Sequence, residues 1–147
     1  SDVVSEKKYS DRILETLRKY HNRAIETAQV IEEMIQMAKD MALDAEQAAK
    51  LGLNADEIAF YRALIQNEAA VKELGDSNLR ELAKYVTEQL RASTTVDWQV
   101  RESVRAKLRN LVRRALRKWK YPPDKAEEAI ELCLKQAEAL SQVWSSA

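Results

Sequence analysis

Apolar residues recur at spacings of three and four along most of the chain, the pattern of helices that bury one face. One such run extends from Ser10 to about Leu51, which is long for a single helix, so we expect a break near residues 20–23. Shorter runs follow after Asn54 and again from Ala126. No convincing strand pattern occurs. The sequence therefore predicts an all-α fold, a single compact bundle of about five to seven helices.

Capping and breaking residues mark the expected helix ends. Asn54 followed three residues later by Glu57 is close to a capping box. The helix that begins there is expected to pause at Asn67 and to stop at Gly75. The proline pair at 122–123 forbids continuation of a later helix.

The stretch between Asp97 and Pro123 predicts the most strongly patterned helix. Asp97 is a suitable N-cap, which leaves about 22 helical residues before the prolines. The apolar residues that share one arc of this helix are Val100, Val104, Leu108, Leu111, Val112, Ala115, Leu116 and Trp119. The basic residues that we expect to contact a partner protein or DNA phosphates are Arg109, Arg113, Arg114, Arg117, Lys118 and Lys120.

Arg101 and Arg105 depart from this pattern, because both project inside the apolar arc. A guanidinium in such a place needs a carboxylate partner. We expect at least one of the two to be buried and to form a structural ion pair with an acidic residue of an earlier helix. The candidate partners are Glu68, Glu73 and Asp76.

Composition agrees with a helical chain, since only two glycines and two prolines occur in 147 residues. Lys plus Arg equals Asp plus Glu, 24 of each. The distribution is uneven: the net charge is −4 over residues 1–75, +7 over 76–121 and −3 over 122–147. The middle block carries the positive field, which leaves two interpretations open, contact with nucleic acid or contact with another protein.

The sequence offers no constellation for catalysis, cofactor binding or metal binding. His21 is the single histidine and Cys133 the single cysteine, so a zinc site or a histidine-based triad is excluded within one chain. Two isolated glycines cannot form a phosphate-binding loop. We expect His21 to hydrogen-bond between helices, and Cys133 and the three methionines to pack in the core. No apolar run approaches the roughly 20 residues that span a membrane.

Several segments resemble one family. The run D-W-Q-V-R-E-S-V-R-A-K-L-R-N-L-V-R-R-A-L-R-K-W-K-Y-P-P-D-K at 97–125 resembles the C-terminal signature of the restriction (R) subunit of type I restriction–modification enzymes. The segments similar to earlier parts of the same domain are Y-H-N-R at 20–23, A-Q-V-I-E-E at 28–33, A-F-Y-R-A-L at 59–64, N-E-A-A-V at 67–71 and L-G-D at 74–76. The resemblance covers about residues 10–140.

The resemblance implies a docking role for this chain, without catalytic activity of its own. The R subunit is an ATP-driven DNA translocase and endonuclease, a hydrolase for which ATP and Mg²⁺ are implied, and the resemblance is to its C-terminal helical domain. That domain is expected to dock the motor onto the methyltransferase and specificity subunits, in the cytoplasm, and to border the DNA path. No membrane contact is expected.

The chain does not begin with Met, and we interpret it as a piece of a larger protein. We expect residues 1–9 to be a linker or a frayed end, and residues 10–147 to be the helical docking domain. The alternative is a stand-alone nucleic-acid-binding protein that uses the helix at 98–120.

Overall fold

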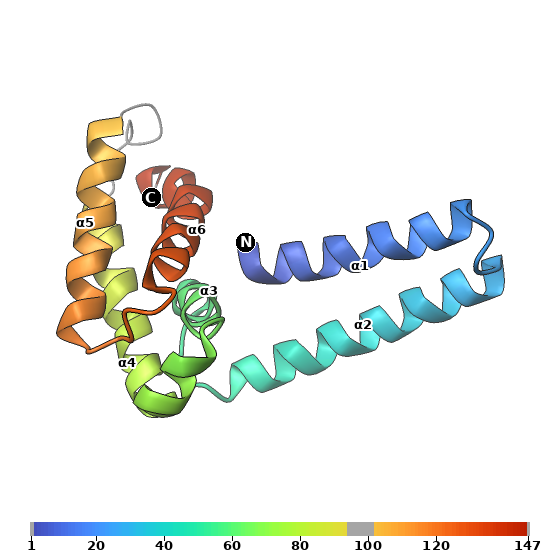
Figure 1. Ribbon diagram of the computed structural model, residues 1–147, viewed down its shortest axis with the longest axis horizontal. Coiled ribbons are helices and arrows are strands. Elements are labelled where there is room, and N and C mark those ends of the chain that lie inside the picture. The colour runs from blue at the N-terminus through green and yellow to red at the C-terminus, as the bar shows by residue number, and fades with distance from the viewer. Residues whose placement is uncertain (1, 94–101, 147) are drawn as a thin grey trace. The chain divides into compact units, whose positions relative to one another are not determined.

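The computed structural model describes residues 2–93 and 102–146, and their regular structure is helical (Figure 1). The helices are α1 (Val3–His21), α2 (Thr27–Ala49), α3 (Ala55–Leu64), α4 (Glu68–Ser93), α5 (Glu102–Lys118) and α6 (Ala126–Ser146). The all-α class is therefore confirmed. The chain divides into two compact units rather than one: a hairpin unit, Ser5–Gly52, and a bundle unit made of Leu53–Ala147 together with Ser1–Val4.

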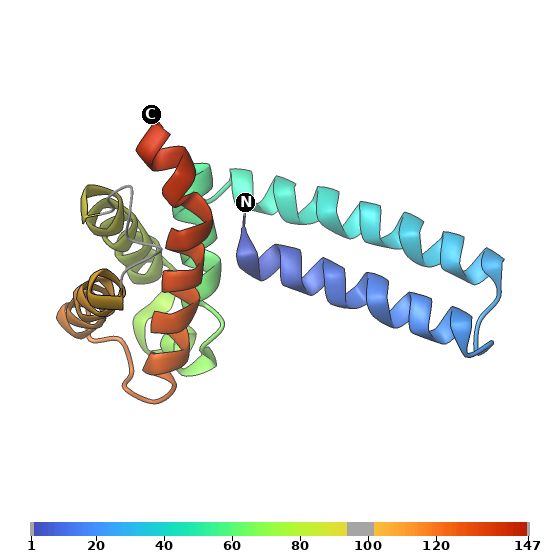
Figure 2. The same cartoon turned by 90° about the horizontal axis from the view of Figure 1, so that it is seen from above.

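In the hairpin unit, α1 and α2 run antiparallel and side by side along their lengths (Figures 1 and 2). The expected break in the long apolar run is confirmed, because α1 ends at His21 and Arg23 turns the chain with a φ of 60°. Glu26 and Gln29 then form a reciprocal capping box that starts α2. His21 is exposed beside the ring of Tyr20, instead of lying between helices as expected.

The hairpin unit has a thin interior. Its buried side chains, among the described residues, are Tyr9, Thr16, Met37 and Ala48. The Tyr9 hydroxyl donates to the carboxylate of Asp44, and burial together with this bond raises the pKa of Tyr9. The prediction that the three methionines pack in the core is only partly correct. Met37 is 4% exposed, but Met41 is 49% exposed.

The bundle unit begins with the capping signals that the sequence predicts. The Asn54 side chain accepts a hydrogen bond of 2.8 Å from the Glu57 N–H, and the Glu57 carboxylate accepts one of 2.9 Å from the Asn54 N–H. The pause at Asn67 is also confirmed. Its side chain accepts from the N–H of Ala69 at 3.0 Å and donates to the carbonyl of Asp124 at 2.9 Å, so it caps α4 and also holds the turn before α6.

Gly75 interrupts α4 with a φ of 77° and a ψ of 164°, so helical geometry stops there as expected. Asp76, directly after the glycine, accepts a hydrogen bond from the hydroxyl of Tyr61. Burial and this bond together raise the pKa of Tyr61 to about 12. The kink thus ties α4 to α3.

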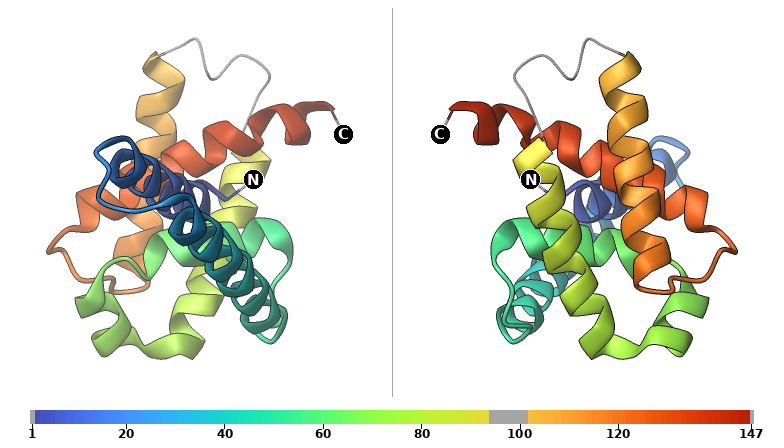
Figure 3. Two further views of the ribbon diagram at one scale, coloured as in Figure 1. Left: turned by 90° about the vertical axis from the view of Figure 1, so that its right-hand side faces the viewer. Right: turned by 90° about the vertical axis from the view of Figure 1, so that its left-hand side faces the viewer.

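The hydrophobic core of the bundle unit lies where α3, α4, α5 and α6 meet, and α6 passes behind α4 and α5 in the right-hand view of Figure 3. Fully buried side chains come from each of these helices, including Phe60, Leu82, Leu108 and Leu134. Cys133 is 0% exposed, and burial raises the pKa of its thiol to about 12, which confirms it as a core residue.

The chain's first residues belong to the bundle unit as well. The N–H of Val3 donates to the side chain of the buried Gln136 at 2.9 Å, and Asp2 forms an ion pair with Arg62. Because α1 starts at Val3, residues 3–9 are helical rather than the linker or frayed end that we expected. The hydrogen bond to a buried amide explains why this end is ordered.

The apolar arc of α5 is as expected within the described residues. Leu108, Val112 and Leu116 are buried, and the helix ends at Lys118, before the proline pair. Asp97, Val100 and Arg101, and with them the expected start of this helix, lie outside the described residues.

Candidate interaction surfaces

Three arginines of α5 form a row of ion pairs with α6. Arg105 lies 3.3 Å from Glu138, Arg109 lies 2.9 Å from Glu131, and Arg113 lies 3.1 Å from Glu127. The arginines are spaced four apart, so they stack along one side of α5. Because α6 runs antiparallel, its glutamates meet them in reverse order. We call these six residues the ion-pair ladder.

The ladder is partly solvated. The arginine side chains are 29–34% exposed and the glutamates 45–67% exposed, so each pair contributes no more than about 1 kcal/mol. Arg113 also donates to Asn110 at 2.8 Å, and two of its nitrogens reach Glu127. The ladder therefore fixes the register of α5 against α6 more than it stabilises the fold.

The ladder corrects the prediction for Arg105. This residue does form an ion pair, but it is 30% exposed and its partner Glu138 comes from the later helix α6, not from an earlier one. Asp76, one of the proposed partners, is engaged by Tyr61 and Arg80 instead. The reason is topological: the short connection after α5 folds α6 back along it, so the α6 carboxylates are the closest ones.

The rest of the predicted basic set remains on the surface. Arg109 and Arg113 are engaged in the ladder, whereas Arg114, Arg117, Lys118 and Lys120 are exposed. Lys107 is exposed on the same helix. The ammonium of Lys118 lies 4.7 Å from the ring centre of Tyr85 on α4. We call these five exposed cations the basic stripe: Lys107, Arg114, Arg117, Lys118 and Lys120.

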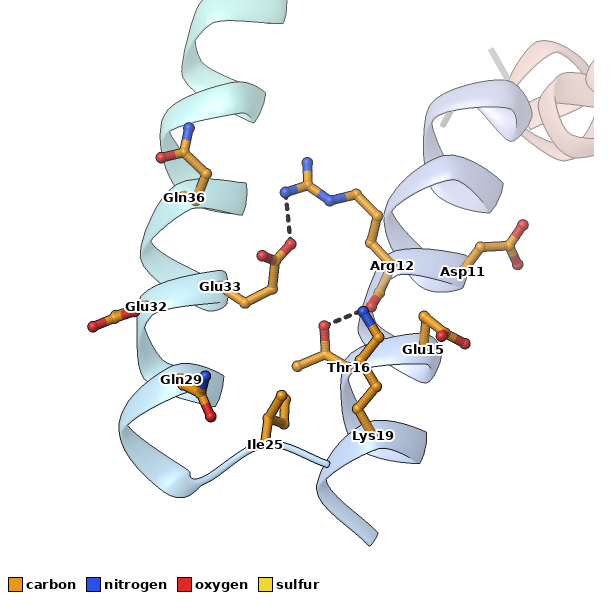
Figure 4. Close-up of a pocket in the computed structure, with 10 residues that line it drawn as sticks. All are labelled: Asp11, Arg12, Glu15, Thr16, Lys19, Ile25, Gln29, Glu32, Glu33 and Gln36. Atoms are coloured by element: carbon orange, nitrogen blue, oxygen red, sulfur yellow. Dashed lines mark hydrogen bonds and ion pairs between the residues drawn. The ribbon is translucent and has the colours of Figure 1, made fainter. Parts of the chain in front are cut away.

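One face of the hairpin unit is a polar groove with a volume of 650 Å³ (Figure 4). Arg12 of α1 reaches across it and donates to Glu33 and Asp40 of α2, each at 2.8 Å. The Arg12 guanidinium, with a further hydrogen bond from Gln36, lowers the pKa of Asp40. The Arg12 guanidinium and the Glu33 and Asp40 carboxylates of the groove thus pair with one another. Sequence reasoning did not single out Arg12, because helical spacing alone does not show which charges face a neighbouring helix.

The hairpin unit also carries most of the exposed apolar surface. Ten large hydrophobic side chains are exposed among the described residues, and eight of them belong to the hairpin unit. Those eight are Ile13, Leu14, Leu17, Tyr20, Ile31, Ile35, Met41 and Leu43. Monomeric proteins rarely leave so many large apolar side chains together on one element. The hairpin unit is therefore the part of the chain most suited to bury surface against another protein.

The described residues place no set of three or more His, Cys, Asp and Glu side chains where they could hold a metal ion. None of the described helices combines the length and apolar character needed to cross a bilayer.

The chain belongs to the family of C-terminal regions of type I restriction enzyme endonuclease subunits. The family described as "Type I restriction enzyme HindI endonuclease subunit-like, C-terminal" matches residues 1–143. The type I restriction enzyme HindI endonuclease subunit of Haemophilus influenzae is 44% identical over 142 residues, which is 97% of this chain. The putative type I restriction enzyme MjaIXP endonuclease subunit of Methanocaldococcus jannaschii is 31% identical over 106 residues, or 70% of this chain.

The aligned part is a small share of these relatives, 14% of the first and 10% of the second. No solved structure matches this chain. The resemblance drawn from the sequence motifs is confirmed as a family relationship.

Proposed function

We propose that this chain is the non-catalytic domain with which a type I restriction endonuclease subunit docks onto its methyltransferase–specificity core. The observation that carries the proposal is the exposure of eight large apolar side chains on one hairpin, in a family whose members are subunits of a larger enzyme. Such surface costs free energy in water and is stabilised by burial in an interface. The bundle unit, by contrast, buries its own core.

The activity of the whole subunit lies outside this chain under the same proposal. ATP and Mg²⁺ would be bound, and DNA would be cut, by the remaining length of the polypeptide, in the cytoplasm. This assignment of catalysis to the rest of the subunit is supported by the described residues, which do not bring together side chains that could bind a metal ion. This chain would position the endonuclease subunit on the methyltransferase–specificity core and determine which core it binds.

A second, DNA-contacting role would fall to the basic stripe. Four of its cations are exposed on α5 and Lys120 follows directly after that helix, whereas the ladder pairs the other described arginines of α5 with glutamates. Each phosphate neutralised by these side chains would add about −0.9 to the slope of log affinity against log salt. The double variant Arg114→Glu with Arg117→Glu should reduce that slope, while the matched control Lys72→Glu with Lys135→Glu should leave it unchanged.

The docking proposal is tested by competition. The purified chain, added in excess, should displace the full-length endonuclease subunit from the methyltransferase–specificity core and should itself neither hydrolyse ATP nor cut DNA. The control is Met37→Asp, which places a charge in the interior of the hairpin unit and should abolish competition. Intact assembly at saturating amounts of the chain would contradict the docking role.

A further inference from the structure

Helix α2 has apolar side chains on two different sides. The first side faces α1 and includes the buried Met37 and Ala48. The second is exposed along the whole helix, and Ile31 and Ile35 on it are 55% and 52% exposed. Its members, which we call the seam, are Ala28, Ile31, Ile35, Ala38, Ala42, Ala45 and Ala49. A helix that already packs on one neighbour thus offers a second complete apolar side.

The spacing of the seam specifies what can cover it. Its members alternate at intervals of three and four residues without interruption, which is the a and d pattern of a coiled coil over three heptads. Only another helix matches that repeat along its length. Five of the seven members are alanine, so the covering helix can approach closely, near the short end of the usual 8–10 Å between axes.

Helix α1 extends this apolar surface. At about 100° per residue, the side chains that line the polar groove fall on one side of each hairpin helix, and the exposed apolar side chains other than Leu43 fall on the opposite side. Leu43 projects on the groove side of α2 and is not part of the apolar face. On α1 the exposed apolar residues are Ile13, Leu17 and Tyr20, with Leu14 beside them. The hairpin unit therefore has a polar face, closed by Arg12, and an apolar face made of the seam and these residues.

We propose that the apolar face of the hairpin unit binds one α-helix of another subunit of the restriction complex, completing a three-helix bundle. The helix would carry an aliphatic stripe of heptad spacing along the seam, and its flank would contact the exposed residues of α1. This proposal rests on the docking function proposed above and assigns it to a defined surface.

Charge further defines the partner. Glu32, Lys39 and Glu46 occur at intervals of seven on the outer flank of the seam, and all three are exposed. The partner helix should therefore present a basic, an acidic and a basic residue at matching positions. Complementary flanking charges select among helices with equally apolar stripes.

A second copy of this chain would not supply those charges. The flank of the seam nearer α1 is uncharged: Thr27, Met34, Met41 and Ala48. In a parallel pair these residues would face the charged flank and leave it unpaired. In an antiparallel pair centred on the seam, Lys39 would face its own copy and Glu32 would face Glu46. Like charges would meet at all three positions, which favours a different chain as the partner.

The affinity of the full-length endonuclease subunit for the methyltransferase–specificity core tests the seam. Ala38→Arg places a charge in the middle of the seam and should weaken binding about 100-fold. The matched control is Gln47→Arg, which adds the same side chain at an exposed position on the other side of α2 and should leave affinity unchanged. A charge-reversed flank, Glu32→Lys with Lys39→Glu and Glu46→Lys, should weaken binding about tenfold at low salt and approach wild type at high salt.

Other results overturn the seam while leaving the docking function intact. If Ala38→Arg binds like wild type and Arg114→Glu with Arg117→Glu does not, docking uses the bundle unit. If seam amides exchange much more slowly in the free full-length subunit than in the purified chain, the covering helix belongs to the same polypeptide. If the purified chain forms a dimer that Ala38→Arg dissociates, a second copy covers the seam. Failure of the purified chain to compete for the methyltransferase–specificity core would instead contradict the docking function itself.

Discussion

The ion-pair ladder and the hydrophobic core of α5 can be compared directly by truncating neighbouring residues. Leu108 is 0% exposed, so Leu108→Ala removes buried methyl groups and leaves a cavity, at a cost of about 2–5 kcal/mol. Arg109→Ala removes one ladder pair. Its Nε lies 2.9 Å from Glu131, but the two side chains are 34% and 45% exposed, so solvent reduces the loss to about 1 kcal/mol or less.

Thermal unfolding followed by circular dichroism measures the difference. In a domain of 60–100 residues, each kcal/mol corresponds to about 4–8 °C in Tm. Leu108→Ala should therefore lower Tm by at least about 8 °C, and Arg109→Ala by no more than about 8 °C. Arg117→Ala, an exposed residue of the basic stripe on the same helix, serves as the control and should leave Tm unchanged.

A double-mutant cycle isolates the pair itself. Arg109→Ala combined with Glu131→Ala should give a coupling free energy of about 1 kcal/mol or less, since the pair is partly solvated. A coupling of several kcal/mol, or an Arg109→Ala variant as unstable as Leu108→Ala, would refute the reasoning. The ladder would then stabilise the bundle unit as strongly as its apolar core does.

Three further outcomes are expected. Arg12 lowers the pKa of Asp40, so this carboxylate stabilises the hairpin above the ordinary aspartate pKa, and the contribution is lost as pH falls through the lowered value. The protection factors of α1 amides, which compare exchange with the intrinsic rate at the same pH, should accordingly fall below about pH 4, and Asp40→Asn should remove that pH dependence. Asn54→Ala should destabilise the bundle unit by about 1 kcal/mol in urea unfolding, because the Glu57 N–H loses its acceptor. Cys133, with a pKa near 12 and no exposure, should react with iodoacetamide only after the chain unfolds, and labelling of the folded chain would contradict its burial.

Local signals in the sequence were sufficient for much of the fold. The Asn54 capping box, the interruption at Gly75 and the end of α5 before the proline pair each depend on a few adjacent residues, and each is found as predicted. The buried arc of α5 follows in the same way from 3.6-residue periodicity. Such features are decided within one helix, so a single sequence contains the information.

Features that depend on which helices become neighbours could not be predicted in the same way. Arg105 needed a carboxylate, but its choice of Glu138 follows from α6 folding back along α5. Helical spacing places Met37 and Ile35 on different sides of α2, but it does not show which of the two sides packs against α1 and which stays exposed. The division into two units and the exposure of the seam could not be predicted for the same reason, because both depend on which helices pack together.

The thin interior of the hairpin unit has a consequence for the lifetime of the protein. With few buried side chains of its own, the hairpin opens locally at low free-energy cost whenever its apolar face is uncovered. Proteases cleave such transiently opened segments first. Under the docking function proposed above, an unassembled subunit would therefore be degraded faster than an assembled one.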